Sequence, residues 1–477
     1  MGLLAFCSQL FVNSRSLPRR SSARSVNLSQ IRIALAQAGV RPAKKLGQNF
    51  LHDQNLARWI VQQAQISAED FVLEIGPGLG ALGGEILRRG ARLLALEKDA
   101  RLVDFLREKF LDSKCEIRHC DALDFDTRIL LAERNVKVIG NLPYYVASQL
   151  LLHFVDFPSR ISLGLFMLQD EMARRLSAKP RTADYGALTL RLQLHHRVEY
   201  LRKIPRTVFV PQPEVASAIV RFTPRDERQI GISDYKFFRE IVKHGFSQRR
   251  KQLRNLLAAD VGNWEDIASK IRAPLTARAE ELSREQWIEL ANLIALDNVK
   301  SAAQAGPERF PIVDENDREI GSASRQEVHE NNFRHRAVHI LIFNRIGELL
   351  LQKRSPWKDR HPLLWDSSTA GHVEANEQYD ETADRELDEE LGVTAQLRPI
   401  GKLPASEKTG QEFIVVYRGE HNGPFRYPSE EISAVEFVPV DIVERWVANK
   451  PEDFAPGFLE SWRLFKAKSR STKSGCL

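Results

Sequence analysis

The stretch Phe71-Val72-Leu73-Glu74-Ile75, which runs directly into Gly76-Pro77-Gly78-Leu79-Gly80, decides the fold that we expect for the first three-fifths of this chain. Its first half is an apolar run of strand length, and a helix is expected after the glycines, through Arg89. Glycine has no Cβ, so such a turn lets a ligand approach the backbone closely. The turn alone is not specific, and NAD would be the more common ligand to infer from it.

Three more segments are expected to be strands, each followed by a polar residue. Residues 92–96 lead to Glu97, 115–119 to Asp121 and 136–140 to Asn141. Strands that alternate with helices predict an α/β fold of Rossmann-like type with a doubly wound parallel sheet. Glu97 lies 21 residues after Gly76, where a carboxylate can accept both hydroxyls of a ribose. Asp121 and Asn141 fit a nucleoside with an amine at its edge better than a dinucleotide.

The stretch Asn141-Leu142-Pro143-Tyr144 suits the binding of a flat heterocycle that carries an exocyclic amine. An aromatic ring can stack on the heterocycle, while the amide oxygen and a backbone carbonyl accept hydrogen bonds from the NH₂ group. Tyr144 and Phe209 are the candidates for stacking on both faces of the base. Both residues are also compatible with ordinary core aromatics, and the four residues alone are compatible with a simple strand-to-turn corner.

The charge of the chain is distributed unevenly. Residues 1–300 hold 46 of the 69 Lys and Arg residues and 33 of the 63 Asp and Glu residues, which leaves them strongly basic. Residues 301–477 are acidic, although the whole chain has a net charge of only +6. The first part is therefore expected to approach a polyanion, and the second to be a different domain. The four cysteines lack metal or disulfide spacing, which fits a reducing compartment.

No apolar run reaches transmembrane length, so a soluble, cytoplasmic protein without membrane contact is expected. The first acidic residue is Asp53, and the segment before it is rich in Arg and Ser. Such a start resembles an organelle transit peptide. A basic arm that touches RNA, or a wrongly assigned start codon, would give the same composition.

Several motifs occur together and in register. They are Gln48-Asn49-Phe50-Leu51, Glu74-Ile75-Gly76-Pro77-Gly78, Glu97, Asp121-Ala122, Asn141-Leu142-Pro143-Tyr144 and Phe209-x-Pro211-x-Pro213-x-Val215. In this order they closely resemble the bacterial small-subunit (16S) rRNA adenine N6-dimethyltransferases, the kasugamycin-resistance family. The resemblance covers residues 41 to 294 and includes Phe166-Met167-Leu168-Gln169. It implies dimethylation of two adjacent adenosines in the 3′-terminal hairpin of small-subunit rRNA, in an immature subunit.

The resemblance also implies a site for S-adenosylmethionine and assigns a role to each matching position. Asn49, Leu51, Gly76 and Gly78 would line the methionine side, Glu97 would bind the ribose, and Asp121 would bind the adenine amine. Asn141 would lie where cofactor and target meet, with Leu142, Pro143, Tyr144 and Phe209 around the target base. The chain departs from the family at Gly83, where Thr is usual, and at Glu214 and Ala216, which replace Lys and Asp.

Residues 234–294 are expected to be helical and to help grip the RNA. Basic residues gather there, and two more precede the first motif: the candidates for phosphate contact are Lys44, Lys45, Arg249, Arg250, Lys251 and Arg254. A run of charge is usually only a solvated face. Beside a base-binding pocket and within a basic region, phosphate contact is the better interpretation.

The C-terminal part contains the most specific motif of the chain. Strands are expected at 310–321, 335–344 and 348–353, and from Gly371 the sequence runs Gly-x5-Glu377-x7-Arg385-Glu386-Leu387-x-Glu389-Glu390-x-Gly392-Val393. This pattern fits every fixed position of the Nudix box, the motif of the Nudix hydrolases, and the C-terminal part therefore resembles that family. On a helix, Glu386, Glu389 and Glu390 share one face, and such oxygen ligands suit Mg²⁺ or Mn²⁺. Metal-dependent hydrolysis of a small molecule that contains a diphosphate is expected, with Glu377 paired to Arg385.

Within the Nudix proteins, Phe333-Arg334-His335-Arg336-Ala337 and Leu364-Trp365-Asp366 resemble the isopentenyl-diphosphate isomerase branch. The isomerase has a catalytic Cys just before the Gly-His pair, and this chain has Ala370 there. A hydrolase of that branch is therefore expected rather than an isomerase, with a substrate that the sequence does not disclose.

The expected organisation is a fusion enzyme that acts as a monomer. Its segments are a basic start (1–27), a methyltransferase domain (28–225), a helical domain (226–298), a linker (299–311), a Nudix domain (312–468) and a tail (469–477). Two alternatives remain at this point. The first part could be an RNA- or DNA-binding factor without turnover, or the Nudix part could be an RNA-end hydrolase with the first part as its RNA-delivery module.

Overall fold

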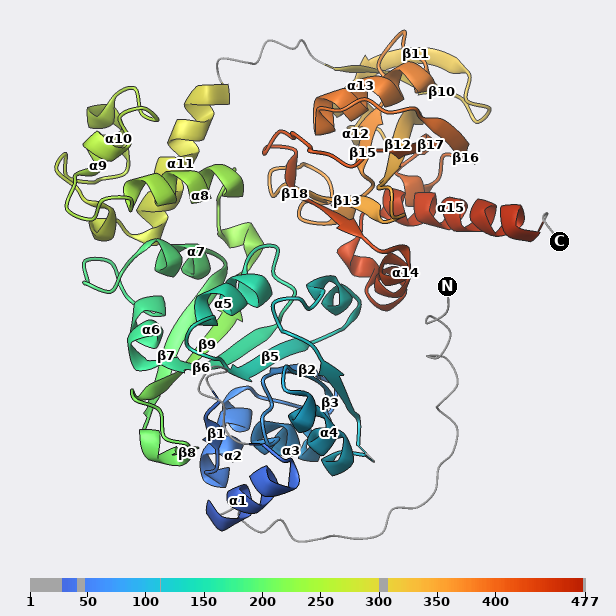
Figure 1. Ribbon diagram of the computed structural model, residues 1–477. Helices are drawn as coiled ribbons and strands as arrows, with labels where there is room; N and C mark the ends of the chain where they lie inside the picture. The colour runs from blue at the N-terminus through green and yellow to red at the C-terminus, as the bar shows by residue number, and fades with distance from the viewer. Residues whose placement is uncertain (1–27, 41–47, 112, 300–307, 475–477) are drawn as a thin grey trace.

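A computed structural model describes residues 28–40, 48–111, 113–299 and 308–474. The chain forms an N-terminal α/β domain, a small helical domain above it and a C-terminal α/β domain to the side (Figure 1). Parts of the expected start, linker and tail, and the candidates Lys44 and Lys45, lie outside the described residues.

The N-terminal domain is built on a seven-stranded sheet in the order β4-β3-β2-β5-β6-β9-β7. Its strands are β2 (Phe71–Ile75), β3 (Arg92–Glu97), β4 (Cys115–His119), β5 (Val136–Asn141), β6 (Leu163–Gln169), β7 (His196–Ile204) and β9 (Ser217–Pro224). The first five in spatial order are parallel, as expected. Strand β9, which was not predicted, pairs antiparallel with both β6 and β7 at the edge of this parallel arrangement. A separate two-stranded ladder joins β1 (Phe50–Leu51) to β8 (Phe209–Val210).

Helices cover both faces of this sheet, as the continuous burial of its central strands requires. They are α1 (Leu28–Gln37), α2 (Gln54–Gln63), α3 (Ala81–Arg88), α4 (Ala100–Lys109), α5 (Ala147–Val155), α6 (Asp170–Leu176) and α7 (Ala187–His195). Val72 and Ile139 pack with α2 and α3 on one face. Leu73 and Val138 pack with α5 on the other. The expected helix of residues 55–64 begins one residue earlier, with Asp53 as its N-cap, because the Asp53 side chain accepts a hydrogen bond from Leu56 N at 3.0 Å.

The helical domain follows β9 and has a hydrophobic core of its own. It contains α8 (Tyr235–Gly245), α9 (Leu253–Leu256), α10 (Trp264–Lys270) and α11 (Arg284–Val299). Trp287 of α11 is fully buried at the crossing with α8. A Cβ at Gly245 would lie 2.4 Å from the Trp287 ring, so the close packing of these two helices requires glycine there. This confirms the helical character expected for residues 234–294.

The C-terminal domain is built on a mixed seven-stranded sheet and a separate hairpin. Its strands are β10 (Arg309–Val313), β11 (Glu319–Ser324), β12 (His335–Phe343), β13 (Leu349–Arg354), β14 (Trp365–Asp366), β15 (Thr369–His372), β16 (Arg398–Leu403), β17 (Glu412–Glu420) and β18 (Ile432–Val438). The strand expected over 310–321 was wrong, since β10 and β11 form an antiparallel hairpin. Between them Asp314 accepts hydrogen bonds from the backbone of Asn316 and Arg318, which is typical of an Asx turn.

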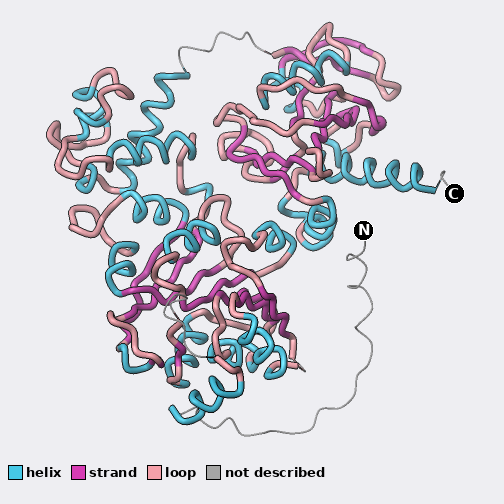
Figure 2. Tube along the Cα trace, viewed as in Figure 1, coloured by secondary structure: helices cyan, strands magenta, loops and turns pink. Residues whose placement is uncertain are grey.

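Helices pack on both sides of this second sheet (Figure 2). They are α12 (Arg325–Glu330), α13 (Tyr379–Leu391), α14 (Val440–Asn449) and α15 (Pro456–Ser474). Gly392 ends α13 in the left-handed conformation with a φ of 64°, the C-terminal cap that glycine favours. No helix among the described residues combines the length and the apolar character that crossing a bilayer requires.

Candidate active sites

A pocket opens at the carboxyl ends of β2, β3 and β5, where the parallel register brings three strand ends together. Gly76 and Gly78 line it, and their φ angles of +65° and +57° lie in the left-handed region that favours glycine. A Cβ at Gly78 would lie 3.0 Å from the Phe50 ring. A Cβ at Gly76 would lie 3.9 Å from Asn141 O, so the glycine turn and the end of β5 face the same space.

Glu97 closes the end of β3 and is almost fully buried. Its carboxylate accepts hydrogen bonds from Gly78 N at 3.2 Å and from Asp99 N at 2.9 Å. Burial raises the pKa of Glu97, and these backbone hydrogen bonds oppose that rise. The carboxylate is therefore fixed against the glycine turn and presented to the pocket.

Asn141 lies on the wall of the same pocket. Its side-chain nitrogen donates a hydrogen bond to Asn49 O at 3.0 Å, which holds the amide in one orientation. Because the nitrogen is used in this contact, the side-chain oxygen is the atom left to accept from a bound amine. Pro143 follows on the pocket wall, and Tyr145 beside it is 61% exposed.

Asp121, beyond the end of β4, also lines the pocket. Lys98 Nζ lies 2.5 Å from Asp121 Oδ2, and Leu123 N donates to Oδ1 at 3.1 Å. The hydrogen bond from Lys98 lowers the pKa of Asp121, so the carboxylate stays ionised near neutral pH. Lys98 is thus a charged neighbour of the site that sequence patterns did not single out.

In the C-terminal domain, Gly371 of β15 lies directly under the helix that carries the acidic residues. A Cβ at Gly371 would lie 2.0 Å from the carboxyl carbon of Glu386, so only glycine lets Glu386 approach the strand this closely. Glu390, one turn further along α13, accepts a hydrogen bond from Thr369 Oγ1 at 2.5 Å and one from Ala370 N at 3.3 Å. Burial raises the pKa of both carboxyls, and burial together with repulsion from Glu390 raises that of Glu386 to about 8.

Arg385 holds the acidic side chains of this site in place through several ion pairs. Its guanidinium donates to Glu377 Oε1 at 2.8 Å and to Glu377 Oε2 at 3.0 Å, which confirms the expected pair. The same group contacts Glu386 Oε1 and Glu389 Oε2, each at 2.9 Å. Glu389 is 60% exposed at the edge of the site, so it is held outward while Glu386 and Glu390 face β15.

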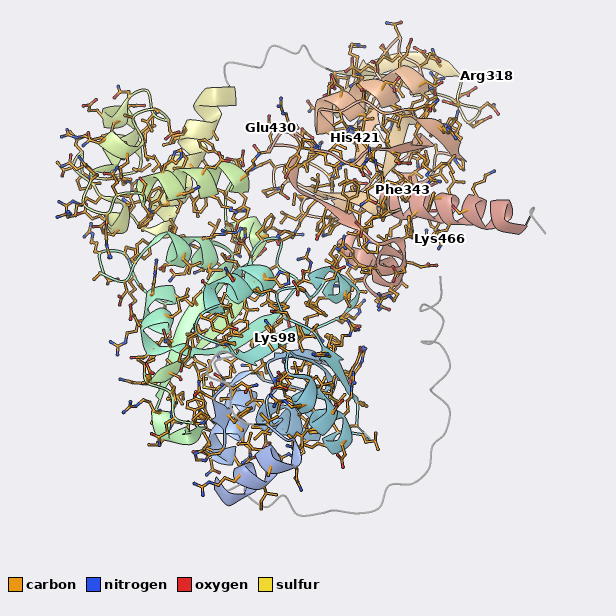
Figure 3. All side chains as sticks on the ribbon, viewed as in Figure 1. Lys98, Arg318, Phe343, His421, Glu430 and Lys466 are labelled. Carbon is orange, nitrogen blue, oxygen red and sulfur yellow. The ribbon has the colours of Figure 1, made fainter. Side chains whose placement is uncertain are left out.

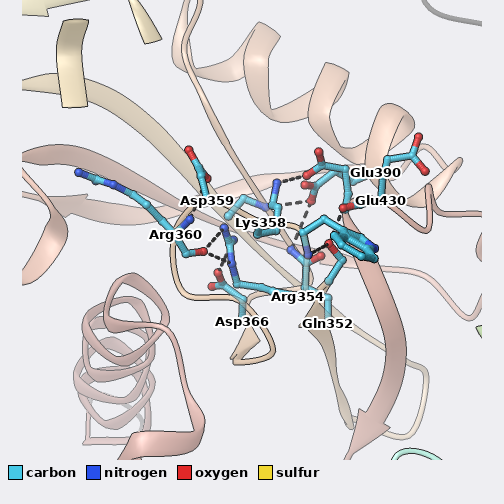
Figure 4. Close-up of polar contacts among 12 residues, drawn as sticks. Gln352, Arg354, Lys358, Asp359, Arg360, Asp366, Glu390 and Glu430 are labelled. Atoms are coloured by element: carbon cyan, nitrogen blue, oxygen red, sulfur yellow. Dashed lines mark hydrogen bonds and ion pairs between the residues drawn. The ribbon is translucent and has the colours of Figure 1, made fainter. Parts of the chain in front are cut away.

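A second pocket lies beside Gly371 and is bordered by basic side chains, namely Arg325, Arg354, Arg360 and Lys408. The polar network around it is shown in Figure 4. Arg354 Nη1 donates to Asp366 Oδ2 at 3.1 Å, and Gln352 Nε2 donates to Glu390 Oε2 at 3.4 Å. Two residues of β13 therefore contact acids on either side: Arg354 contacts Asp366 at the basic pocket, and Gln352 contacts the buried Glu390 of α13.

Three histidines form a compact group at the other side of this pocket. The ligand nitrogens of His329, His335 and His372 all lie within 4.8 Å of one another. Glu412 lies 3.4 Å from His372 Nε2 and 3.6 Å from His335 Nε2. Both ring nitrogens of His329 and Nε2 of His335 are buried without a hydrogen-bond partner. Imidazole nitrogens and a carboxylate in this arrangement fit a divalent transition-metal ion.

Comparison with known proteins separates the chain into two matches. Residues 40–296, more than half of the chain, match the family model for ribosomal RNA adenine dimethylase. The chain belongs to the ribosomal RNA adenine dimethylase family. Residues 333–458 match the model for the NUDIX domain, so the dimethylase carries a NUDIX domain at its C-terminal side.

Curated relatives match the dimethylase part over nearly their whole length. The ribosomal RNA small subunit methyltransferase A of Chlorobium phaeobacteroides is 41% identical over 247 residues, which cover 52% of this chain and 91% of the relative. The protein of the same name from Francisella tularensis subsp. novicida is 38% identical over 267 residues, covering 54% of this chain and 100% of the relative. Among solved structures, DR0079 from Deinococcus radiodurans is 28% identical, with a TM-score of 0.28, and covers 31% of this chain and 91% of that chain.

The structure brings most of the residues selected for the dimethylase pocket together. The residues that line it are Asn49, Gly76, Gly78, Glu97, Asp121, Asn141 and Pro143. Leu51 and Leu142 are buried in the hydrophobic core behind it. Tyr144 is half-buried, and its hydroxyl lies 2.8 Å from Ser217 Oγ.

Phe209 corrects the expectation of two aromatic rings around a base. Its side chain is only 2% exposed and packs in the core with Leu51, Ile204 and Ile219. The ring therefore fills the core behind β1 in this structure instead of forming a wall of the pocket. Tyr145, which sequence reasoning missed, is the exposed aromatic residue at the pocket.

The basic candidates of the helical domain are all exposed, but they do not share one helix. Arg249, Arg250 and Lys251 lie in the turn between α8 and α9, and Arg254 lies on α9 itself. The expected phosphate contact therefore concerns a loop and the helix that follows it. The histidine group of the NUDIX domain was also missed, because its three members stand on three separate elements, α12, β12 and β15.

Proposed function

We propose that the dimethylase domain binds S-adenosylmethionine in the pocket at the ends of β2, β3 and β5 and dimethylates two adjacent adenosines near the 3′ end of small-subunit rRNA. The observation that carries this proposal is that the Asn141 amide and the Gly76–Gly78 turn line one pocket. A cofactor held by the turn and an amine held by Asn141 would therefore meet.

The residues of the pocket fit that cofactor in type and place. The buried Glu97 carboxylate would accept the ribose hydroxyls, and Asp121 would accept the adenine amine after exchanging its contact with Lys98. The glycine turn, Asn49 and Leu51 would hold the methionine side, Leu51 by supporting the backbone of β1. When bound, S-adenosylmethionine supplies a methyl group on a sulfonium.

Asn141 would act on the target amine. The lone pair of an adenine N6 is delocalised into the ring, which makes the nitrogen a poor nucleophile. Hydrogen bonds from its two protons to the Asn141 oxygen and to the carbonyl of Leu142 or Pro143 would return electron density to nitrogen. Because the methyl transfer needs little else, the positioning of the amine and the methyl group would supply most of the rate acceleration.

Aromatic residues at the pocket would stack on the flipped base, and basic residues would contact the RNA phosphates. Tyr144 and Tyr145 are the aromatic candidates for the flipped base, since Phe209 is buried. Arg249, Arg250, Lys251 and Arg254 would contact phosphates, and Lys44 and Lys45 remain candidates on sequence grounds. The rRNA of an immature small subunit is the partner that this charge pattern favours.

We propose further that the NUDIX domain hydrolyses a small molecule that contains a diphosphate, with Mg²⁺ or Mn²⁺ at Glu386 and Glu390 and with Glu389 completing the set. The metal would supply charge neutralisation and an activated water. The basic pocket of Arg325, Arg354, Arg360 and Lys408 beside Gly371 supports a phosphate-rich substrate. A second ion, of a type that prefers imidazole, would bind His329, His335, His372 and Glu412.

Two point variants of the full chain test both halves. Asn141→Ala is expected to reduce transfer of labelled methyl groups to an immature small subunit by at least about 100-fold, while S-adenosylmethionine still binds. Glu386→Gln is expected to abolish phosphate release and leave methylation unchanged. Wild-type protein that binds the cofactor but transfers no methyl group would favour the non-catalytic binding factor.

A further inference from the structure

The short 3-10 helix η2 (Thr127–Ala132) joins the hydrophobic cores of two domains. Leu130 packs in the core of the dimethylase domain. The next two residues, Leu131 and Ala132, are 6% and 1% exposed and pack instead with Trp446 and other residues of the NUDIX core. Asn449, at the end of α14, donates its amide to Ala132 O at 2.8 Å. Adjacent residues of one helical turn thus belong to both domains.

Arg128 extends this contact with charge. Its guanidinium is held by Asp126 of the same turn in two parallel hydrogen bonds of 2.9 Å. From there it reaches the NUDIX domain, where it lies 3.0 Å from Glu348 Oε1 and donates to Phe437 O at 2.7 Å. A guanidinium fixed on its own domain in this way is pre-organised for its partner.

Two further ion pairs cross the boundary in largely buried positions. Arg160 pairs with Glu436, and their side chains are only 13% and 21% exposed. Within this pair, Arg160 Nε and Glu436 Oε2 are buried and have no hydrogen-bond partner. In the second pair the base belongs to the NUDIX domain and the acid to the first part of the chain: Lys353 Nζ of β13 lies 2.6 Å from Glu227 Oε2. Removing one member of such a pair leaves an uncompensated buried charge, whereas an exposed pair contributes little.

The direction of charge across the boundary agrees with the charge of the two halves. Arg128, Arg134 and Arg160 come from the basic half and meet glutamates of the acidic half, Arg134 through a 2.9 Å contact with Glu452. Such complementarity favours one partner and one register. The uneven charge of the sequence thus serves contacts within the chain as well as contacts with RNA.

The docking surface lies at the end of the first sheet that is opposite to the cofactor pocket. It includes the segments that precede β5 and β6, whereas Asn141 ends β5 at the pocket. β5 has six residues, so about 20 Å of strand separate the two regions. In Figure 3, the labelled Lys98 lies in the dimethylase domain, well away from the labelled residues of the NUDIX domain.

We propose that this charge-complementary surface holds the two catalytic domains together as one rigid body, independently of the peptide that links them. The occupant of the η2 surface is the NUDIX domain of the same chain, seated through α14, β13 and β18. The hydrolase is therefore carried at a fixed position behind the methylation site and leaves the mouth of that site open to RNA.

A cleavable linker tests this proposal in the full chain. A specific protease site is placed within residues 300–307, cleavage is followed on a denaturing gel, and the product is passed over a size-exclusion column. The two pieces are expected to elute together at micromolar concentration. Separate elution of the wild-type pieces would overturn the proposal.

A charge exchange supplies the specific control. Arg160→Glu and Glu436→Arg are each expected to weaken the association of the cleaved pieces by about tenfold or more, and the double variant is expected to recover most of that loss. Arg318→Glu reverses an exposed charge elsewhere on the NUDIX domain and should change nothing. Cooperative thermal unfolding of each variant reports that both domains are folded. Folded single variants that associate as tightly as wild type would contradict the role of this surface.

Discussion

At the scale of single residues, Glu74 of β2 is a buried carboxyl whose protonation affects the stability of the fold. Its side chain is 2% exposed, and Oε2 has no hydrogen-bond partner. Burial raises its pKa from 4.5 to about 8. The chain has Gly83 at the position next to this oxygen, where the related methyltransferases usually have Thr, so the hydroxyl that could serve it is missing.

The sign of the resulting pH dependence follows from linkage. The folded state binds the Glu74 proton more tightly than the unfolded state, so its stabilising contribution is present below pH 4.5 and is lost as pH rises toward 8. Glu74→Gln should therefore gain stability over wild type as pH rises, by about 1.4 kcal/mol per unit in that range. Melting temperatures of both proteins between pH 5 and 8.5 check this. Parallel curves would show that Glu74 is ionised in the folded protein.

The histidine group predicts a countable metal ion. Full-length protein is exposed to Zn²⁺ or Mn²⁺ and then dialysed. The His329→Gln variant should retain about one bound ion per chain fewer than wild type, because one imidazole ligand is removed. Elemental analysis by mass spectrometry measures the ratio. His421→Gln, which changes a histidine outside the group, is the matched control. Equal metal content in wild type and His329→Gln would show that the three histidines are packed side chains that bind no metal ion.

At the scale of elements, the contact between β15 and α13 should control hydrolysis. Gly371→Ala places a Cβ where the Glu386 carboxyl lies, 2.0 Å from its carbon, so the carboxyl must move. We expect hydrolysis to fall by about tenfold or more while methylation is unchanged. Gly321→Ala is the control, since a Cβ there meets nothing within 4 Å. Full hydrolytic activity of Gly371→Ala would show that Glu386 need not lie against the strand.

Element boundaries show what local patterns can predict. The bounds of β4 match the expected residues 115–119, where polar Glu116 and Arg118 alternate with Cys115 and Ile117, a period typical of a strand. The hairpin of β10 and β11 was taken as one strand, because the turn between them contains neither Gly nor Pro and uses Asp314 instead. The position of β9 was not predicted, since one of its two neighbours in the sheet, β6, is distant in sequence.

The candidate sites show the same difference between residues that sequence patterns predict and residues that only tertiary packing brings together. Gly76, Glu97 and Asn141 were found because strand order alone brings their positions to one edge of the sheet. Phe209 was selected from a family motif, and a motif does not show that its ring packs in the core behind β1 in this structure. The group of His329, His335 and His372 forms only when α12, β12 and β15 pack together, and its spacing in the sequence carries no signal.

At the scale of the whole molecule, the two catalytic sites should work independently although the domains are docked. The docking surface lies at the amino ends of β5 and β6, and the methylation pocket lies at their carboxyl side. We expect the affinity for S-adenosylmethionine to stay within about twofold after linker cleavage and in Arg160→Glu, because the surface contacts no residue of that pocket. Calorimetric titration measures this. A larger loss would indicate coupling through the sheet.

The most direct measurement of the central claim is the chemical identity of the product. Small-subunit rRNA that lacks the modification is incubated in subunit form with the protein and S-adenosylmethionine, then digested to nucleosides and analysed by mass spectrometry. We predict N6,N6-dimethyladenosine at two residues per RNA with wild-type protein and none with Asn141→Ala. Wild-type protein that binds the cofactor but leaves all adenosines unmodified, or an Asn141→Ala variant that matches wild type, would contradict the account.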